Sequence, residues 1–231
     1  MTTIRETIYG AEDPWVGFDA SKYSNRLETW CVEERQPVLA RLILERRPRL
    51  MAEIGSWKGW SACLFARALQ VAHEDGPREL VAVDTWLGSA EMLIQPQIPE
   101  NPCFLDRLNG MPRVYWQFMA VVKSHGLDGI VTPFAQPSEG AAIFFAHKGV
   151  RFDAVYIDAA HDRQSVLRDL LAWGALLREG GLLFGDDYDP KSDPQVVQAV
   201  DEFVAKNGLR LAHEGRTWWI DNAGEQAKQN G

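Results

Sequence analysis

A short glycine-containing turn between an apolar run and an amphipathic run constrains this chain more than any other stretch. Residues 50–52 are apolar, the turn reads Glu53-Ile54-Gly55-Ser56-Trp57-Lys58-Gly59-Trp60-Ser61, and an amphipathic segment follows over 62–71. This order predicts a buried strand that breaks at a glycine turn and leads into a helix. Open α/β sheets hold nucleotide-like ligands at turns of this kind.

The side chains of this turn argue against one group of ligands. A dinucleotide fingerprint needs glycine two residues after its first glycine, and again three residues later, so that a pyrophosphate can approach the backbone. This sequence has Trp57 and Trp60 at those two positions. Because these two positions must lack a side chain in a dinucleotide site, the two tryptophans argue against NAD or FAD as the ligand.

What remains is a carboxylate at the strand end, two glycines, and free backbone amides at a helix start. A helix start suits a carboxylate and Glu53 suits an ammonium, so the set fits a ligand with an α-amino-acid end. The E-x-G-x-x-x-G-x-S string resembles motif I of class I S-adenosylmethionine (SAM) methyltransferases, in the form used by catechol and caffeoyl-CoA O-methyltransferases. The resemblance implies that this turn holds SAM through Glu53, Gly55, Ser56, Trp57, Gly59 and Ser61.

Strands and helices are expected to alternate along most of the chain. Apolar periodicity and turn residues predict strands at 50–54, 79–84, 129–134, 153–157, 181–185, 209–214 and 217–221, and helices at 60–72, 112–125, 138–147, 163–178 and 195–206. Asp193-Pro194 reads as the N-cap and first residue of the last helix. With the resemblance, this alternation implies a Rossmann-like α/β fold: a seven-stranded, mostly parallel sheet with a terminal antiparallel strand and helices on both faces.

The remaining segments flank or interrupt this core. We expect an N-terminal arm and helices over 1–47, irregular up to residue 26 and helical over 27–47. The methyltransferase core is expected over 48–222, with a substrate lid at 86–120, and 223–231 reads as a flexible tail. Helices like 27–47 often mediate dimers in this fold, so a homodimer is a possible assembly.

Composition excludes several functions and partners. The net charge of −8 argues against a nucleic-acid partner, which would require a basic surface. Three widely spaced cysteines suggest neither a disulfide framework nor a zinc site, and no run approaches the length of a membrane span. A cytoplasmic protein without a membrane partner is therefore expected. Nine tryptophans serve either core packing or the lining of a pocket for a flat or sugar-like substrate.

Residues at the ends of the predicted strands are candidates for the rest of the SAM site. Strand 79–84 ends at Asp84, whose carboxylate can accept both ribose hydroxyls of an adenosyl ligand or act as a cap in a solvated turn; Thr85 and Trp86 follow it. Ser138 aligns with the residue that binds the adenine edge in related O-methyltransferases, and is equally a fair N-cap. The resemblance implies SAM contacts for these residues and for Asp158.

Carboxylates from two neighbouring strand ends form the most specific pattern. Asp158 follows strand 153–157, and Asp186 and Asp187 follow strand 181–185. Unpaired, they would repel one another, and a hard divalent cation with oxygen ligands resolves that conflict. Metal-dependent O-methyltransferases carry Asp and an Asp-Asn pair here, so the resemblance implies that these three aspartates hold Mg²⁺ or another divalent cation. The alternative is that they cap loops and face solvent.

His161 lies where catechol-type enzymes keep a lysine that takes the hydroxyl proton. A histidine titrates near neutral pH and can perform the same task, with Asp158 beside it in the catalytic set. Alternatively, His161 orients Asp158 or caps the following helix. The resemblance, which covers about 48–221 and extends to macrocin-type sugar O-methyltransferases, implies methyl transfer to a hydroxyl of a small molecule: a sugar, a glycoside or a catechol-like ring. The alternatives are a metal-free N- or O-methyltransferase, a SAM- or nucleotide-binding module without catalysis and, least favoured, a dinucleotide oxidoreductase.

Overall fold

The computed structural model describes residues 2–24, 36–99, 101 and 103–221. Seven strands form one sheet in the order β5 (Val131–Ala135), β2 (Glu79–Asp84), β1 (Leu50–Ile54), β6 (Phe152–Ile157), β7 (Leu177–Gly185), β9 (Thr217–Asp221) and β8 (Arg210–Glu214). All neighbours pair in parallel except β9, which is antiparallel to β7 and to β8. The predicted Rossmann-like sheet is confirmed.

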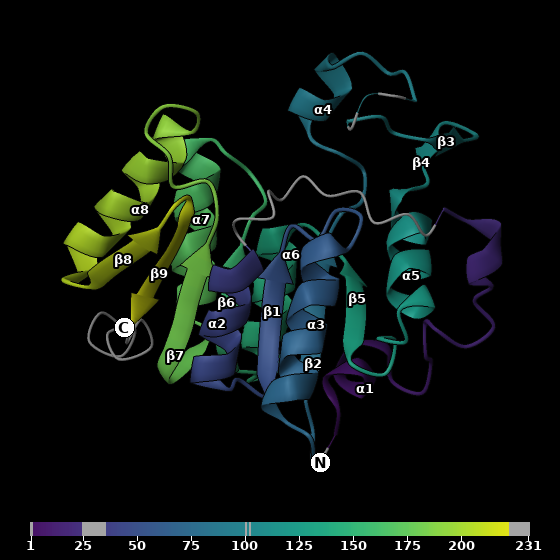
Figure 1. The fold of residues 1–231 in the computed structure, drawn as a ribbon, viewed down its shortest axis with the longest axis horizontal. Coiled ribbons are helices and arrows are strands. Elements are labelled where there is room, and N and C mark those ends of the chain that lie inside the picture. The colour runs from purple at the N-terminus through teal and green to yellow at the C-terminus, as the bar shows by residue number, and fades with distance from the viewer. Residues whose placement is uncertain (1, 25–35, 100, 102, 222–231) are drawn as a thin grey trace.

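Helices cover both faces of this sheet (Figure 1). One face packs against α2 (Gln36–Arg46), α3 (Trp60–Ala72) and α5 (Val114–Ser124), and the other against α6 (Ser138–His147), α7 (Arg163–Gly174) and α8 (Pro194–Asn207). Side chains alternate along a strand, so Met51 of β1 lies in the first core and Ala52 in the second. Two buried faces explain why the central strands read as continuous apolar runs.

Several predicted boundaries are wrong. The helix predicted over 163–178 ends at Gly174, because β7 already begins at Leu177. Residues 1–26 are not all irregular: they contain α1 (Ile4–Tyr9) and a short 3₁₀ helix η1 (Ala20–Lys22). The missed signal was a capping box, in which Thr3 and Glu6 satisfy each other's backbone amides. The predicted helical stretch 27–35 and the tail 223–231 lie outside the described residues.

The segment predicted as a lid divides into two parts. Residues 90–112 contain α4 (Ala90–Ile94) and the small hairpin of β3 (Arg107–Leu108) and β4 (Met111–Pro112), which lie beyond the carboxyl ends of the strands (Figure 1). Residues 114–120 instead begin α5, with Val114, Phe118 and Met119 fully buried in the core. A lid role therefore remains a prediction for the first part alone.

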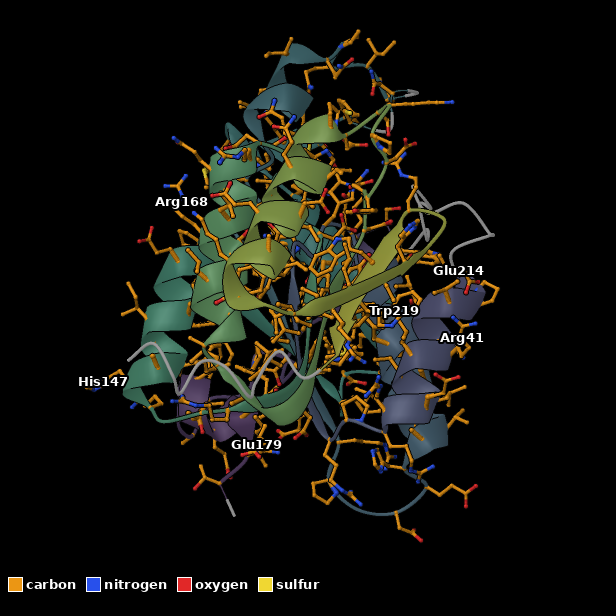
Figure 2. The ribbon with its side chains drawn as sticks, turned by 90° about the vertical axis from the view of Figure 1, so that its left-hand side faces the viewer. Arg41, His147, Arg168, Glu179, Glu214 and Trp219 are labelled. Carbon is orange, nitrogen blue, oxygen red and sulfur yellow. The ribbon has the colours of Figure 1, made fainter. Side chains whose placement is uncertain are left out.

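Each edge of the sheet is anchored by side chains from earlier in the chain. At one edge, Arg41 of α2 forms an ion pair with Glu214 of β8 at 2.8 Å, beside Trp219 (Figure 2). At the other edge, the N-terminal segment binds carbonyls of β5: Arg5 and the Trp15 indole donate to Val131, at 2.9 and 3.0 Å. These bonds cover an otherwise open strand edge. None of the described helices has both the length and the apolar character that crossing a membrane would require.

Replacing Arg5 by alanine should lower the free energy of unfolding by about 1–3 kcal/mol, because carbonyls at the β5 edge lose a charged donor. Urea denaturation monitored by tryptophan fluorescence measures the change. The matched control is Arg168→Ala on the outer face of α7 (Figure 2), which should shift stability by less than about 0.5 kcal/mol. Equal stabilities for the two variants would contradict the anchoring role of Arg5.

Candidate active site

A cavity of about 460 Å³ opens where β1, β6 and β7 end. Its wall combines the turn after β1, the loops after β6 and β7, and residues of the lid segment. The residues concerned are Gly55, Ser56, Trp57, Lys58, Trp60, Ser61, Ser89, Met92, Gln95, Cys103, Tyr156, Asp158, Ala159, His161, Asp186, Asp187 and Arg216. Ligands of open α/β sheets bind at this edge.

The glycines of the turn are required by close packing as well as by backbone conformation. Gly55 has φ +93°, and a Cβ there would lie 2.0 Å from the carbonyl oxygen of Asp158. Gly59 has φ +88°, and a Cβ there would lie 2.9 Å from the Phe118 ring. The turn can therefore lie directly against the end of β6, which places Ser56 and Asp158 in one cavity wall.

Glu53 is a fully buried carboxylate at the end of β1. Within the described part of the chain, neither of its oxygens has a hydrogen-bond partner, and the same holds for the hydroxyl of Ser56 and the indole nitrogen of Trp57. Burial raises the pKa of Glu53 to about 7, against the smaller lowering effect of Ser61 and Ser56 nearby. Buried polar atoms for which the described residues supply no partner are expected beside a ligand site.

The residues predicted after β2 hold the turn in shape. Asp84 accepts hydrogen bonds from the backbone amides of Trp57 at 2.9 Å and Trp86 at 2.7 Å. Both tryptophans have positive φ, at 43° and 52°, so these bonds stabilise a strained backbone. The Trp86 indole is buried and donates to the Trp57 carbonyl at 2.7 Å, whereas Thr85 is exposed. Asp84, Thr85 and Trp86 do not belong to the cavity lining.

Ser138 also lies away from the cavity lining. It opens α6, where it makes no capping bond; instead its hydroxyl donates to Asp169 and accepts from the Trp173 indole at 2.9 Å. Burial raises the pKa of Asp169 to about 6. The predicted SAM contacts of Ser138 and of the residues after β2 therefore remain predictions.

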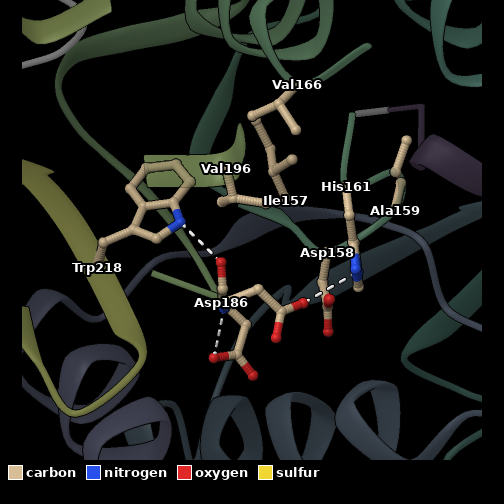
Figure 3. Close-up of a pocket in the computed structure, with 10 residues that line it drawn as sticks. Ile157, Asp158, Ala159, His161, Val166, Asp186, Val196 and Trp218 are labelled. Carbon is tan, nitrogen blue, oxygen red and sulfur yellow. Dashed lines mark hydrogen bonds and ion pairs between the residues drawn. The ribbon is translucent and has the colours of Figure 1, made fainter. Parts of the chain in front are cut away.

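The loops after β6 and β7 bring acidic side chains together. Ligand atoms of Asp158, His161 and Asp187 lie within 4.8 Å of one another, a group able to hold a metal ion. Asp186 lies beside them (Figure 3), but its carboxylate accepts the amide of Asp187 at 2.8 Å. The set with metal-ligand spacing thus has His161 where Asp186 was predicted. Tyr156 donates to Asp158 at 3.2 Å.

Two residues of the site escaped prediction. Arg216, in the turn between β8 and β9, contacts Asp187 and lies 2.5 Å from a carboxylate oxygen of Asp193. Asp193 occupies the predicted N-cap position of α8, but its side chain makes no capping bond and turns instead to Arg216 and His161. Asp193 was missed because its sequence context predicts an N-cap, and no spacing in the sequence distinguishes Arg216 from the other arginines.

These contacts set the charges of the cluster. Burial raises the pKa of Asp158 well above its usual range, and Asp187 and Asp186 raise it further. The hydrogen bond that His161 donates to Asp187 raises the pKa of His161 to about 9, against the opposing effect of burial. His161 and Arg216 therefore already supply positive charge to the aspartates. The repulsion among the three predicted aspartates is therefore not by itself a reason to expect a metal ion.

The fold and the cavity define a ligand-binding α/β protein of the Rossmann-like class. A family model described as a methyltransferase domain matches residues 52–188. That match spans more than half of the chain, so the protein belongs to this methyltransferase family. A comparison with curated protein sequences found no match to this chain.

Solved structures show the same fold. The O-methyltransferase from Bacillus cereus, in complex with SAH, has a TM-score of 0.57 and 17% identity, covering 83% of this chain and 80% of that one. TomG from Streptomyces achromogenes, involved in tomaymycin synthesis and in complex with SAM, gives 0.59 and 15%, covering 94% and 92%. The calicheamicin methyltransferase CalS11 gives 0.60 and 16%, covering 81% and 77%. The expected methyltransferase fold is confirmed.

Replacing Glu53 by glutamine should stabilise the ligand-free protein above pH 7 by about 1–3 kcal/mol, because a buried charge without a partner is removed. The folded-state pKa of about 7 exceeds the usual 4.5, so the wild type loses stability as pH rises between these values. The gain should vanish near pH 4, where Glu53 is protonated. Urea unfolding at pH 4, 6 and 8 tests this; a gain independent of pH would contradict it.

Proposed function

We propose that this methyltransferase uses SAM to methylate a hydroxyl of a small molecule such as a sugar, a glycoside or a catechol-like ring, assisted by a divalent cation. The observation that carries the proposal is the juxtaposition of two features in one cavity wall. One is the turn after β1, where the Ser56 hydroxyl and the Trp57 indole nitrogen have no hydrogen-bond partner among the described residues, next to the buried Glu53, which is not itself a lining residue. The other is the group of Asp158, His161 and Asp187.

The β1 turn fits the amino-acid end of SAM. Glu53 offers an ammonium a buried carboxylate that has no hydrogen-bond partner among the described residues, and Ser56 and Ser61 offer hydroxyls beside it. The solved complexes of similar fold contain SAH in the Bacillus cereus enzyme and SAM in TomG. When bound, SAM supplies a methyl group on a positively charged sulfur, an intrinsically good group to transfer.

The acidic group fits a divalent cation in part. Carboxylates of Asp158 and Asp187 are hard oxygen donors with metal-ligand spacing. Both oxygens of Asp187 are engaged, however, one by His161 and the other by Arg216. Asp158 and Asp187 would hold the ion, with Asp186 beside them as in the predicted set. A bound cation would lower the pKa of an acceptor hydroxyl.

The cavity wall suits a flat or sugar-like acceptor. Trp57, Trp60 and Tyr156 supply aromatic surface, and Met92 of α4 adds an adaptable apolar contact from the lid side. Volume near 460 Å³ is typical of small-molecule sites. Positioning the acceptor oxygen in line with the methyl group is the main task of such a wall.

His161 is the proposed base. Its ring lies in the cavity wall with Nε2 at 3.0 Å from Asp187. With a pKa of about 9, the ring carries a proton at neutral pH while both carboxylates hold it. It can accept a proton only in the neutral form, when the acceptor hydroxyl replaces Asp187 at Nε2.

Two substitutions should separate binding from chemistry. Asp158→Ala should abolish transfer of tritiated methyl from SAM to a panel of catechols and glycosides, while leaving the SAH affinity measured by calorimetry nearly intact. Glu53→Gln should weaken SAH binding about tenfold or more, because an ammonium loses its charged partner. Glu179→Gln, at a distant exposed site (Figure 2), should change neither. Equal loss of binding and turnover in Asp158→Ala would indicate a structural role instead.

Arg216 favours a second candidate, methyl transfer to oxygen or nitrogen without a metal ion. Its guanidinium already contacts Asp187 and Asp193, so the cluster has a cation of its own. Chelation decides between the two. If the ion is required, exhaustive EDTA treatment should abolish turnover by the wild type, and added Mg²⁺ should restore it. Full turnover after chelation would establish the metal-free candidate.

A further inference from the structure

We propose that Asp193 is a positioning residue for His161, fixing the ring through Nδ1 so that Nε2 faces the acceptor. The inference rests on the proposed function, because it assigns to His161 the removal of a proton from the acceptor hydroxyl. Asp193 is not among the residues that line the cavity, so it acts through His161 rather than on the ligand.

The geometry assigns a separate partner to each nitrogen of the ring. Nδ1 lies 3.1 Å from Oδ1 of Asp193, and Nε2 lies 3.0 Å from Oδ2 of Asp187. Asp187 lines the cavity beside His161, whereas Asp193 lies behind the ring with its side chain 13% exposed. The cavity-side partner of Nε2 is the one that an acceptor hydroxyl can replace.

Asp193 is itself held from three directions. Arg216 lies 2.5 Å from Oδ2 of Asp193, and the Ser192 hydroxyl donates to the same oxygen at 2.6 Å. The backbone amide of Asp193 donates to Asp189 at 2.9 Å. These contacts fix the carboxylate, while α8 behind it is anchored in the second core through Val196 and Val200.

Helix capping does not explain the orientation of this side chain. An aspartate at an N-cap usually accepts a backbone amide of the first turn, and Asp162 does so at the start of α7, accepting from Ser165 at 3.0 Å. Asp193 occupies the same kind of position at the start of α8 without such a bond. Its carboxylate is directed to His161 and Arg216 instead, which favours a role in the site.

In the proposed step, His161 takes the proton of the acceptor hydroxyl as the methyl group moves from sulfur to oxygen. When the neutral ring donates its Nδ1–H to Asp193, Nε2 keeps a lone pair that faces the cavity. The aspartate has the same role in the Asp-His pairs of other enzymes. The acceptor O–H bond breaks, its proton goes to Nε2, and the oxygen electron pair forms the new O–CH₃ bond. The S–CH₃ bond breaks with its electron pair remaining on sulfur, which leaves as the neutral thioether SAH.

A double-mutant cycle tests the inference, using tritiated SAM with a panel of catechols and glycosides. Asp193→Ala should lower kcat about 10- to 1000-fold while changing the KM for SAM less than about threefold. In a His161→Gln background, the same substitution should cause no further loss, because the proposed effect of Asp193 on the rate passes through the His161 ring and not through Arg216. Asp193→Asn, which keeps an acceptor oxygen, should retain an intermediate rate. Asp162→Asn, a neighbouring carboxylate that does not contact His161, should remain at the wild-type rate.

A second readout needs no acceptor. In the SAH-bound protein labelled with ¹⁵N-histidine, the His161 signals are those lost in His161→Gln. Asp193→Ala should shift the Nδ1 signal as its hydrogen bond is lost, and Asp162→Asn should leave it in place. An unchanged Nδ1 signal, or losses that add in the double mutant, would overturn the inference. A wild type inactive on every acceptor would count against the proposed function, while the Nδ1 signal would still decide the position of Asp193.

Discussion

The site depends on the close approach of two strand ends, β1 and β6. The amide of Asp158 donates to the carbonyl of Ile54 at 2.8 Å, continuing the parallel ladder past the last residue of the strand. That bond is possible only because the next residue, Gly55, has no side chain where Asp158 passes. The turn that follows the buried Glu53 and the loop that carries the acidic group therefore share one cavity wall.

The second determinant is the balance of charge at the ends of β6 and β7. Four aspartates gather there, at positions 158, 186, 187 and 193, and two basic groups contact them, His161 and Arg216. Because the basic side chains come from a loop and from the β8–β9 turn, the cluster links three segments distant in sequence. The antiparallel β9 thus has a local role: its preceding turn brings Arg216 to the cavity.

The sequence predicted the strands and helices well because apolar periodicity and turn residues depend mainly on neighbouring residues. Apolar periodicity and turn residues predicted all seven strands of the main sheet, and the last two, β8 and β9, pair as antiparallel neighbours. The group of Asp158 and Asp187 was predicted because parallel strands end at one edge of a sheet. Arg216 and Asp193 were missed because their roles arise from tertiary packing. Asp193 was also assigned to helix capping: it does occupy the N-cap position of α8, but its side chain makes no capping bond.

Asp84 shows how a residue predicted to bind the ligand serves the turn itself. Its two oxygens accept the amides of Trp57 and Trp86, and the backbone of Ser56 and Thr85 also interacts with this carboxylate. Burial raises the pKa of Asp84, while the bonds from Trp86 and Trp57 counteract that rise and favour the charged form. The bonds that shape the turn thus also favour the ionised state of Asp84.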